Sequence, residues 1–365
     1  MTRHMFMNHT LSAALALLLL LCFAPAPTLA QTAPDAQVMA DVQLRLRSAF
    51  STSSPIITLL DPLTPLAVLG VSPERDWLRV QIPNGTMGWV SAEYVDIFID
   101  LDAAFPGGMG ARLTPDVQAH IAQVYAFGQA RGNHPDVFAK VGDSITVNIL
   151  TLNPIGDGIY DLGEYAYLEG VIDFYRGGET RDGHNSFNET PLAAEIGWTT
   201  YGVLDPAEND PDYCRVGESP LMCEYRLLKP SISIIMLGTN DVGILEEEHY
   251  RNNLNLIVNL SEGEGVIPIL TTIPLRDGFE ERSQIFNRIV MEVAQQHAIP
   301  LVDYGGAMLA LGRDGFDEDN VHPSVPPKGY EGAADFREFN LRYGYVLRNL
   351  TALQMLDAVW RATAG

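Results

Sequence analysis

Short runs of alternating apolar and polar residues dominate the chain between residues 38 and 98. Apolar Val42, Leu44 and Leu46 alternate with polar neighbours, which is the period of a strand with one buried face. Asn84-Gly85 separates two further apolar runs and is a strong signal for a hairpin turn. Short strands at such spacing predict a small all-β barrel. The expected strands are Val42–Arg47, Ile56–Leu60, Leu66–Leu69, Trp77–Ile82 and Gly88–Val90.

From residue 116 onward, apolar strands alternate with amphipathic helices. Thr114-Pro115 is typical of a helix start, with Thr114 as the N-cap and Pro115 at the first helical position. Alternating strands and helices favour a parallel sheet covered on both faces. We therefore expect a linker over residues 99–115 and an α/β domain over residues 116–365. Its expected strands are Val137–Val141, Leu192–Ile196, Ile232–Leu237, Val266–Thr271 and Pro300–Asp303, and its clearest helices are Glu280–His297 and Phe339–Trp360.

The connection between the first two of these strands, Val147–Pro191, is unusually long for one crossover. Its first half is rich in Gly and Tyr, and its middle, Leu162–Tyr175, has the pattern of a helix. Long connections beside a sheet edge are often functional. We expect this one to form part of a substrate pocket.

Residues 1–30 have the layout of a secretory signal peptide. Arg3 lies near the start, an apolar run covers Leu11–Phe23, and small residues end the segment at Ala30. These residues are left out of the fold, and the protein is expected to be secreted or extracytoplasmic. The apolar run is short for a spanning helix and no second candidate follows, so the mature chain is expected to have no transmembrane anchor.

Removal of the signal peptide takes Cys22 with it and leaves Cys214 and Cys223. In an exported chain such a pair is expected to form a disulfide, which would stabilise the fold by roughly 2 to 3 kcal/mol in the chain-entropy model. Two unpaired thiols are the alternative. A metal site is disfavoured, because no histidine or further cysteine lies nearby in the sequence.

The charge balance narrows the range of partners. Forty-six acidic residues against 23 basic ones give a formal net charge of −23. Nucleic acids and anionic membrane surfaces both require basic patches, so neither is expected as a partner. The simplest explanation of the negative charge is that it keeps the protein soluble.

Polar clusters follow three of the expected strands. They are Gly142-Asp143-Ser144, Gly238-Thr239-Asn240-Asp241 and Asp319-Asn320-Val321-His322. Each cluster alone is equally a turn sequence, because Gly, Asn, Asp and Ser are favoured in turns. However, the carboxyl ends of parallel strands meet at one edge of a sheet, so we expect the three clusters to converge there.

These clusters contain the residue types that acyl transfer to a serine requires. That reaction needs a base for the hydroxyl proton, a group that orients the base, and donors aimed at the developing oxyanion. His322 is the candidate base, since imidazole titrates near neutral pH, and Asp319 is close enough along the chain to orient it. The Asn240 amide is the candidate donor to the oxyanion formed at Ser144. No cofactor is expected, and no clustered His and carboxylate residues indicate a metal site.

In this order the three clusters resemble the first, third and fifth blocks of the SGNH or GDSL-type hydrolases. The resemblance implies a three-layer αβα sandwich with a five-stranded parallel sheet over residues 116–365. It also implies Ser144 as nucleophile, His322 as base and then acid, and Asp319 as its orienting group. The implied oxyanion hole comprises the Ser144 backbone N–H, the Asn240 amide and a glycine N–H from a second block.

The second block is where this sequence departs from the family pattern. No clean Asn-x-x-x-Gly motif is present, but Ile196-Gly197-Trp198-Thr199-Thr200 is similar to the family's glycine-led turn. We therefore expect Gly197 to supply the third donor, with Gly183 as the alternative. His184 is expected to be a solvated loop residue, and Asp143 to brace the turn through backbone hydrogen bonds.

The barrel segment resembles a bacterial SH3-like domain. The resemblance depends on Leu44-Arg45-Leu46-Arg47-Ser48, Trp77-Leu78-Arg79-Val80 and Gly88-Trp89-Val90-Ser91. Domains of this family often bind cell-wall peptides or glycans, so a cell-wall ligand is an expected partner. The alternative for Trp77 and Trp89 is that both belong to the barrel core, and for Trp77 we favour it.

Together these observations predict an exported serine esterase with an N-terminal SH3-like barrel. Its expected substrate is an ester, and deacylation of a carbohydrate or cell-wall glycan is favoured because the barrel could hold the enzyme on such a polymer. A lipid or aryl esterase of the same family is the nearest alternative. A second alternative is a binding protein without catalysis, in which both domains recognise cell-wall material.

Overall fold

The computed structural model describes residues 34–365, apart from residues 48, 49, 51, 53, 55, 73, 74 and 106–110. The expected signal peptide over residues 1–30, including Cys22, lies outside the described residues. In the described part of the chain, no helix combines the length and the apolar character that crossing a membrane requires.

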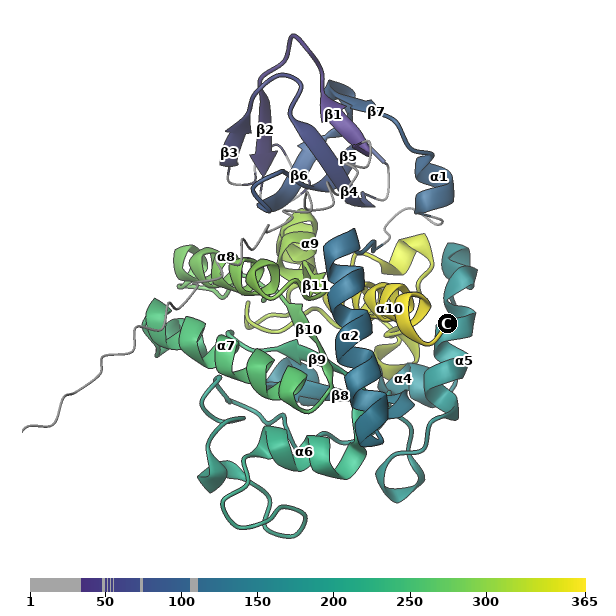
Figure 1. Ribbon diagram of the computed structural model, residues 1–365, viewed down its shortest axis with the longest axis vertical. Helices are drawn as coiled ribbons and strands as arrows, with labels where there is room; N and C mark the ends of the chain where they lie inside the picture. The colour runs from purple at the N-terminus through teal and green to yellow at the C-terminus, as the bar shows by residue number, and fades with distance from the viewer. Residues whose placement is uncertain are drawn as a thin grey trace, which may run out of the picture. The chain divides into compact units, whose positions relative to one another are not determined.

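The N-terminal domain is an antiparallel β structure (Figure 1). All five strands expected from the sequence form, and Asn84-Gly85 lies in the turn between two of them, with Gly85 at a φ of 85°. Two further strands escaped the sequence pattern because each is only three residues long. The strands are β1 (Ala36–Val38), β2 (Leu44–Arg47), β3 (Ile56–Leu60), β4 (Pro65–Val71), β5 (Trp77–Gln81), β6 (Met87–Ser91) and β7 (Val95–Ile97), in the order β3-β2-β6-β5-β4-β1-β7.

The core of this domain is aliphatic. Leu46, Val68, Leu78 and Val90 are fully buried in it. Trp89 is buried too, but its indole Nε1 donates a hydrogen bond of 3.4 Å to Asp303 of the α/β domain. Trp89 is thus a contact between domains and not part of the aliphatic core.

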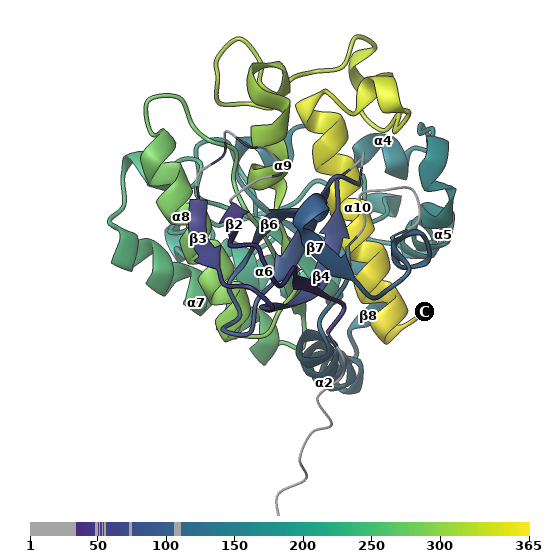
Figure 2. The same cartoon turned by 90° about the horizontal axis from the view of Figure 1, so that it is seen from above.

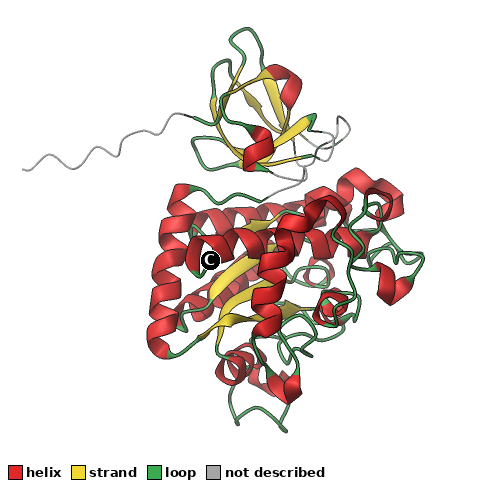
Figure 3. Ribbon diagram, turned by 90° about the vertical axis from the view of Figure 1, so that its right-hand side faces the viewer, coloured by secondary structure: helices red, strands yellow, loops and turns green. Residues whose placement is uncertain are grey.

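The α/β domain is built on a parallel sheet with helices on both faces (Figures 1 and 3). Its strands are β8 (His134–Gly142), β9 (Pro230–Met236), β10 (Ile267–Thr271) and β11 (Leu301–Val302), in the order β11-β10-β9-β8. All three strand pairs are parallel, as the alternating pattern predicted.

Among the described residues the sheet has four strands, so the expectation of a fifth at Leu192–Ile196 is wrong. Only Ala194 makes an isolated parallel bridge, to Gly142 of β8. The backbone N–H of Leu192 donates to the Glu224 carboxylate at 3.0 Å instead of to a neighbouring strand. The segment then leaves the sheet at Gly197, which has a φ of 83°. It lies where a fifth strand would lie, but it is too short to form one.

Helices α7 (Glu247–Gly263) and α8 (Glu280–Gln296) lie on one side of the sheet, and α2 (Pro115–Arg131), α5 (Glu169–Gly177) and α10 (Gly344–Thr363) lie on the other (Figures 1 and 2). Helix α2 begins where the sequence predicted, because the Thr114 side chain accepts from the Val117 N–H and Pro115 needs no partner. The last helix starts later than expected, at Gly344. The remaining helices are α1 (Leu101–Ala104), within the expected linker, α3 (Ser144–Val147), α4 (Asn153–Gly156), α6 (Pro220–Leu228) and α9 (Tyr304–Leu311).

Buried Lys140 on β8 fixes the long connection to the sheet. Its Nζ donates to the Asn153 side chain at 3.1 Å and to the Phe187 carbonyl at 2.8 Å, so it holds both ends of this segment. Burial lowers the pKa of Lys140 to about 8, although the nearby Glu189 and Glu224 charges act to raise it.

Arg181, in the second half of the same connection, is a second point of attachment. Its guanidinium pairs with Glu189 at 2.8 Å and with Glu224 of α6 at 2.9 Å. Close by in the sequence, the expected disulfide joins Cys214 to Cys223 on α6. Ion pairs and a disulfide therefore order a region that has little regular secondary structure of its own.

The barrel and the α/β domain belong to one compact unit, residues 34–365. Besides the Trp89 contact, Arg79 donates to the Leu301 carbonyl at 3.4 Å, and Gln295 on α8 donates to the Asn84 carbonyl at 2.8 Å. Leu301 is on β11, the edge strand of the parallel sheet. The barrel therefore covers backbone groups that an exposed edge strand would leave unpaired.

Candidate active site

Ser144 is the first residue of α3, directly after β8 ends at the carboxyl edge of the sheet. Asp143 is the N-cap of this short helix, and its Oδ1 accepts the Ile145 N–H at 3.0 Å. Glycine is required at position 142, because a Cβ there would lie 2.0 Å from the Thr146 hydroxyl and 2.8 Å from the Met236 carbonyl. The turn that presents Ser144 is therefore closely packed.

The loop after α9 brings His322 to this serine. Ser144 Oγ and His322 Nε2 lie 2.9 Å apart, although the residues are 178 positions apart in sequence. The other ring nitrogen, Nδ1, lies 2.5 Å from Oδ2 of Asp319. The three side chains thus form one continuous hydrogen-bonded chain.

The Asp319 carboxylate also fixes the loop that carries His322. Its Oδ1 accepts the backbone N–H groups of Val321 and His322, each at 2.9 Å. Asn320, between Asp319 and Val321, has a φ of 57°, a conformation that asparagine adopts more readily than most residues. Partial burial acts to raise the pKa of Asp319, but hydrogen bonds from the His322 ring and the two N–H groups outweigh it and lower this pKa to about 2. Asp319 is therefore ionised at neutral pH.

Asn240 follows β9 and contacts the segment that leaves the sheet at Gly197. Its Nδ2 donates to the Trp198 carbonyl at 2.9 Å, so one amide hydrogen is used and the other remains for a ligand. This contact places Gly197 beside Asn240. Among the described residues, no hydrogen bond joins Gly183 to Asn240 or Ser144.

Asp241 supports this arrangement, a role that the local sequence pattern did not predict. Its Oδ1 accepts the Thr200 backbone N–H at 2.8 Å and the Thr200 hydroxyl at 2.6 Å, and Asn253 on α7 donates to the same hydroxyl at 2.9 Å. Burial raises the pKa of Asp241 to about 6, against the opposing effect of the Thr200 donors. The sequence signal for this role was an aspartate directly after Asn240, shortly after the end of a buried strand.

Asp143 is fully buried beside the nucleophile. Burial raises its pKa to about 6, although the Ile145 N–H and the neighbouring Thr239 hydroxyl favour the ionised form. Arg348 of α10 is buried nearby and interacts electrostatically with Asp143, and burial lowers the pKa of this arginine. Asp143 thus braces the serine turn, as its side-chain bond to the backbone shows.

Other residues singled out in the sequence lie outside this arrangement. His184 is exposed on the long connection, as expected. Among the described residues, one group of potential metal ligands occurs, namely Cys214, Glu218 and Cys223. Both sulfur atoms are joined in the disulfide, so this group does not offer thiolate ligands.

Comparison with known proteins identifies the N-terminal domain. Residues 42–96 match the family model of the bacterial SH3 domain, which confirms the family expected for the barrel. No curated protein sequence matches the chain.

Solved structures of bacterial lipases and esterases are similar to part of the chain. A GDSL-like lipase from Bacteroides thetaiotaomicron is 16% identical over 67% of this chain and 99% of its own, with a TM-score of 0.40. A lipase/acylhydrolase from Enterococcus faecalis is 19% identical over 61% of this chain and 95% of its own, with a TM-score of 0.40. An acetylxylan esterase from Geobacillus stearothermophilus is 18% identical over 62% of this chain and 94% of its own, with a TM-score of 0.38. At this level of similarity, an activity has to be inferred from the geometry of the site.

Replacement of Gly142 tests the packing of the serine turn. Gly142→Ala is expected to lower the free energy of unfolding by about 1 to 3 kcal/mol, because the new methyl group overlaps Thr146 and the Met236 carbonyl. Gly177→Ala is the matched control, since nothing lies within 4 Å of its added Cβ. Chemical denaturation of both variants measures the difference, and equal stabilities would contradict the close packing.

Asp143→Asn tests the buried carboxyl group. With a pKa raised from 3.8 to about 6, Asp143 binds its proton more tightly in the folded state, so its contribution to stability is lost as pH rises from about 4 to 6. The loss amounts to at most about 3 kcal/mol. Asparagine is also a good N-cap, so the variant is expected to keep the turn and to lose less stability over this range.

Denaturant unfolding at several pH values between 4 and 7 measures this difference. Asp96→Asn, at an exposed residue of β7, is the matched control and is expected to follow the wild-type curve. Parallel curves for the wild type and Asp143→Asn would show that Asp143 does not hold a raised pKa.

Proposed function

We propose that the α/β domain is a serine esterase that hydrolyses a carboxylic ester. The observation that carries this proposal is the chain of contacts from Ser144 Oγ through the His322 ring to the Asp319 carboxylate, at 2.9 Å and 2.5 Å. An alcohol is a weak nucleophile on its own, and a base within hydrogen-bond reach that is itself oriented by a carboxylate is the arrangement that activates it.

The reaction proceeds in two half-reactions. Ser144 Oγ attacks the acyl carbon while His322 Nε2 takes the hydroxyl proton. His322 then returns this proton to the oxygen of the departing alcohol as the ester C–O bond breaks, leaving an acyl group on Ser144. In the second half, a water molecule gives its proton to His322 and attacks the acyl carbon, and His322 protonates Oγ as the free acid leaves.

The carbonyl oxygen becomes negative in both half-reactions and needs donors fixed before the reaction starts. We assign this role to the backbone N–H groups of Ser144 and Gly197 and to the side-chain amide of Asn240. Asn240 and Asp241 both contact the Gly197–Thr200 segment, so they hold the glycine and the amide in one rigid unit. Donors that are preorganised in this way stabilise the transition state more than the bound substrate.

For the substrate we favour the ester of a carbohydrate or cell-wall glycan. Support comes from the bacterial SH3 domain on the same chain, which is suited to hold the enzyme on a wall polymer. A secreted or extracytoplasmic location agrees with the disulfide between Cys214 and Cys223, because such bonds persist outside the cytosol.

A lipid or aryl ester is a second candidate, favoured by exposed aliphatic residues close in sequence to the site residues. Ile149 follows α3 and is 61% exposed, Ile196 precedes Gly197 and is 76% exposed, and Val325 follows His322 and is 42% exposed. Aliphatic side chains near the nucleophile suit an apolar acyl or aryl group. Hydrolysis rates for acetylated xylo-oligosaccharides and for p-nitrophenyl octanoate distinguish the two candidates.

Replacing the nucleophile or the base tests the catalytic proposal. Ser144→Ala and His322→Ala are each expected to reduce kcat for p-nitrophenyl acetate by about 10³-fold or more, because the two groups act as one unit. His184→Ala is the matched control at an exposed histidine and is expected to keep wild-type turnover. Wild-type turnover in the Ser144→Ala variant would refute the assignment of the nucleophile.

Replacing Asn240 tests the oxyanion donor. Asn240→Ala is expected to reduce kcat by about 10²- to 10³-fold with a small change in KM, since its amide acts mainly in the transition state. Asn255→Ala on α7 is the control for loss of an amide elsewhere. A variant whose KM rises at constant kcat would show instead that Asn240 binds the ground state of the substrate.

A further inference from the structure

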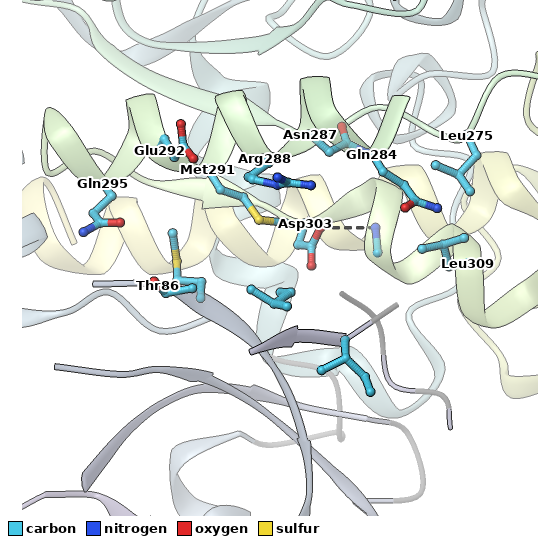
Figure 4. Close-up of a pocket in the computed structure, with 14 residues that line it drawn as sticks. Thr86, Leu275, Gln284, Asn287, Arg288, Met291, Glu292, Gln295, Asp303 and Leu309 are labelled. Carbon is cyan, nitrogen blue, oxygen red and sulfur yellow. Dashed lines mark hydrogen bonds between the residues drawn. The ribbon is translucent and has the colours of Figure 1, made fainter. Parts of the chain in front are cut away.

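A pocket of about 470 Å³ lies between the SH3 domain and helices α8 and α9, separate from the candidate active site (Figure 4). None of Ser144, Asn240 or His322 lines it. Its volume is in the range of sites for small organic ligands and is small for a polymer chain. Neither the ester hydrolysis proposed above nor the match to the bacterial SH3 domain assigns it a role.

One wall of the pocket is aliphatic and comes from both domains. Ile56 and Ile57 of β3 contribute from the SH3 domain, together with Met87 of β6, while Met291 and Leu309 contribute from α8 and α9. Ile56 is 49% exposed and Ile57 38%, although they lie on an edge strand where large apolar side chains are a liability. An apolar ligand would remove this surface from water.

The polar wall follows one face of α8. Gln284, Arg288 and Gln295 are spaced by four and seven residues, so they point to the same side of the helix, which apolar Met291 also shares (Figure 4). Gln295 donates to the Asn84 carbonyl and so ties this face to the SH3 domain. The pocket wall is therefore held by regular secondary structure rather than by a loop.

Arg288 contributes a positive charge to this wall, and no described residue pairs with it. Of the two carboxylates in the pocket, Glu292 is paired with Arg251 at 2.5 Å. Asp303 accepts hydrogen bonds from Thr272 and Gly306 as well as Trp89, and it interacts electrostatically with buried Arg79. Within the part of the chain that the structure describes, no hydrogen bond or ion pair engages the Arg288 guanidinium.

We propose that this pocket binds an aliphatic carboxylate, with the anionic group on Arg288 and the tail on the wall formed by Met291, Met87, Ile56 and Ile57. A guanidinium matches a carboxylate with two parallel hydrogen bonds, and the Gln284 amide adds a further donor. Local charge complementarity favours an anion here, because the pocket offers an unpaired arginine beside an apolar surface. The net charge of −23 opposes an anion at long range, where salt screens it. The proposal does not depend on the esterase activity.

Titration calorimetry of the full chain with octanoate tests this proposal. Saturable binding at one site is expected, and acetate and 1-octanol are each expected to bind at least 10-fold more weakly, since one lacks the tail and the other the charge. Arg288→Gln is expected to weaken octanoate binding at least 10-fold. Arg45→Gln, at an exposed arginine of β2 outside the pocket, is the matched control and should bind as the wild type does.

A variant of the barrel wall extends the test to both domains. Ile56→Gln is expected to weaken octanoate binding several-fold if the tail lies against β3, while circular dichroism and hydrolysis of p-nitrophenyl acetate remain those of the wild type. Octanoate binding that is absent, or that is unchanged by Arg288→Gln, would overturn the proposal. Binding of an acidic peptide or an acetylated glycan fragment in place of octanoate would also overturn it, by assigning the pocket to a different ligand class.

Discussion

The contact between Ser144 Oγ and His322 Nε2 is the interaction on which the candidate site depends. It joins the end of the first strand of the parallel sheet to a loop that follows the last one. Parallel strands deliver their carboxyl ends to the same edge, so residues far apart in sequence meet there without a special fold. The Asp319 side chain supports this contact in two ways. One carboxylate oxygen orients the imidazole, and the other accepts backbone N–H groups of the loop.

Buried polar groups near this contact serve to fix the backbone around the nucleophile. Asp143 caps the turn of Ser144, and Asp241 holds the Thr200 segment. Both carboxyl groups have raised pKa values because they are buried, so their positions disfavour the ionised form. Carboxyl groups in such places lower the free energy of unfolding at neutral pH, but their hydrogen bonds fix the local geometry. Functional sites commonly combine lower stability with fixed geometry in this way.

Much of the architecture and most of the candidate site could be predicted from local sequence. Apolar periodicity gave the main helices and four strands of the parallel sheet, and polar clusters after those strands gave Ser144, Asn240 and His322. The expected strand at Leu192–Ile196 does not form, because the Leu192 N–H donates to the distant Glu224 carboxylate and the segment leaves the sheet at Gly197. Support from Asp241 to Thr200 and the pairing of Trp89 with Asp303 also escaped prediction, since partners so distant in sequence leave no periodic signal.

The most direct measurement of the central claim is the intact mass of the protein after incubation with a fluorophosphonate, followed by peptide mapping. An activated serine displaces fluoride and keeps the phosphonyl group, whereas an ordinary turn serine does not react. If His322 activates Ser144, one adduct per chain forms on Ser144, and the His322→Ala variant forms none. A protein that stays unmodified under these conditions, or that is modified at another residue, would contradict this assignment.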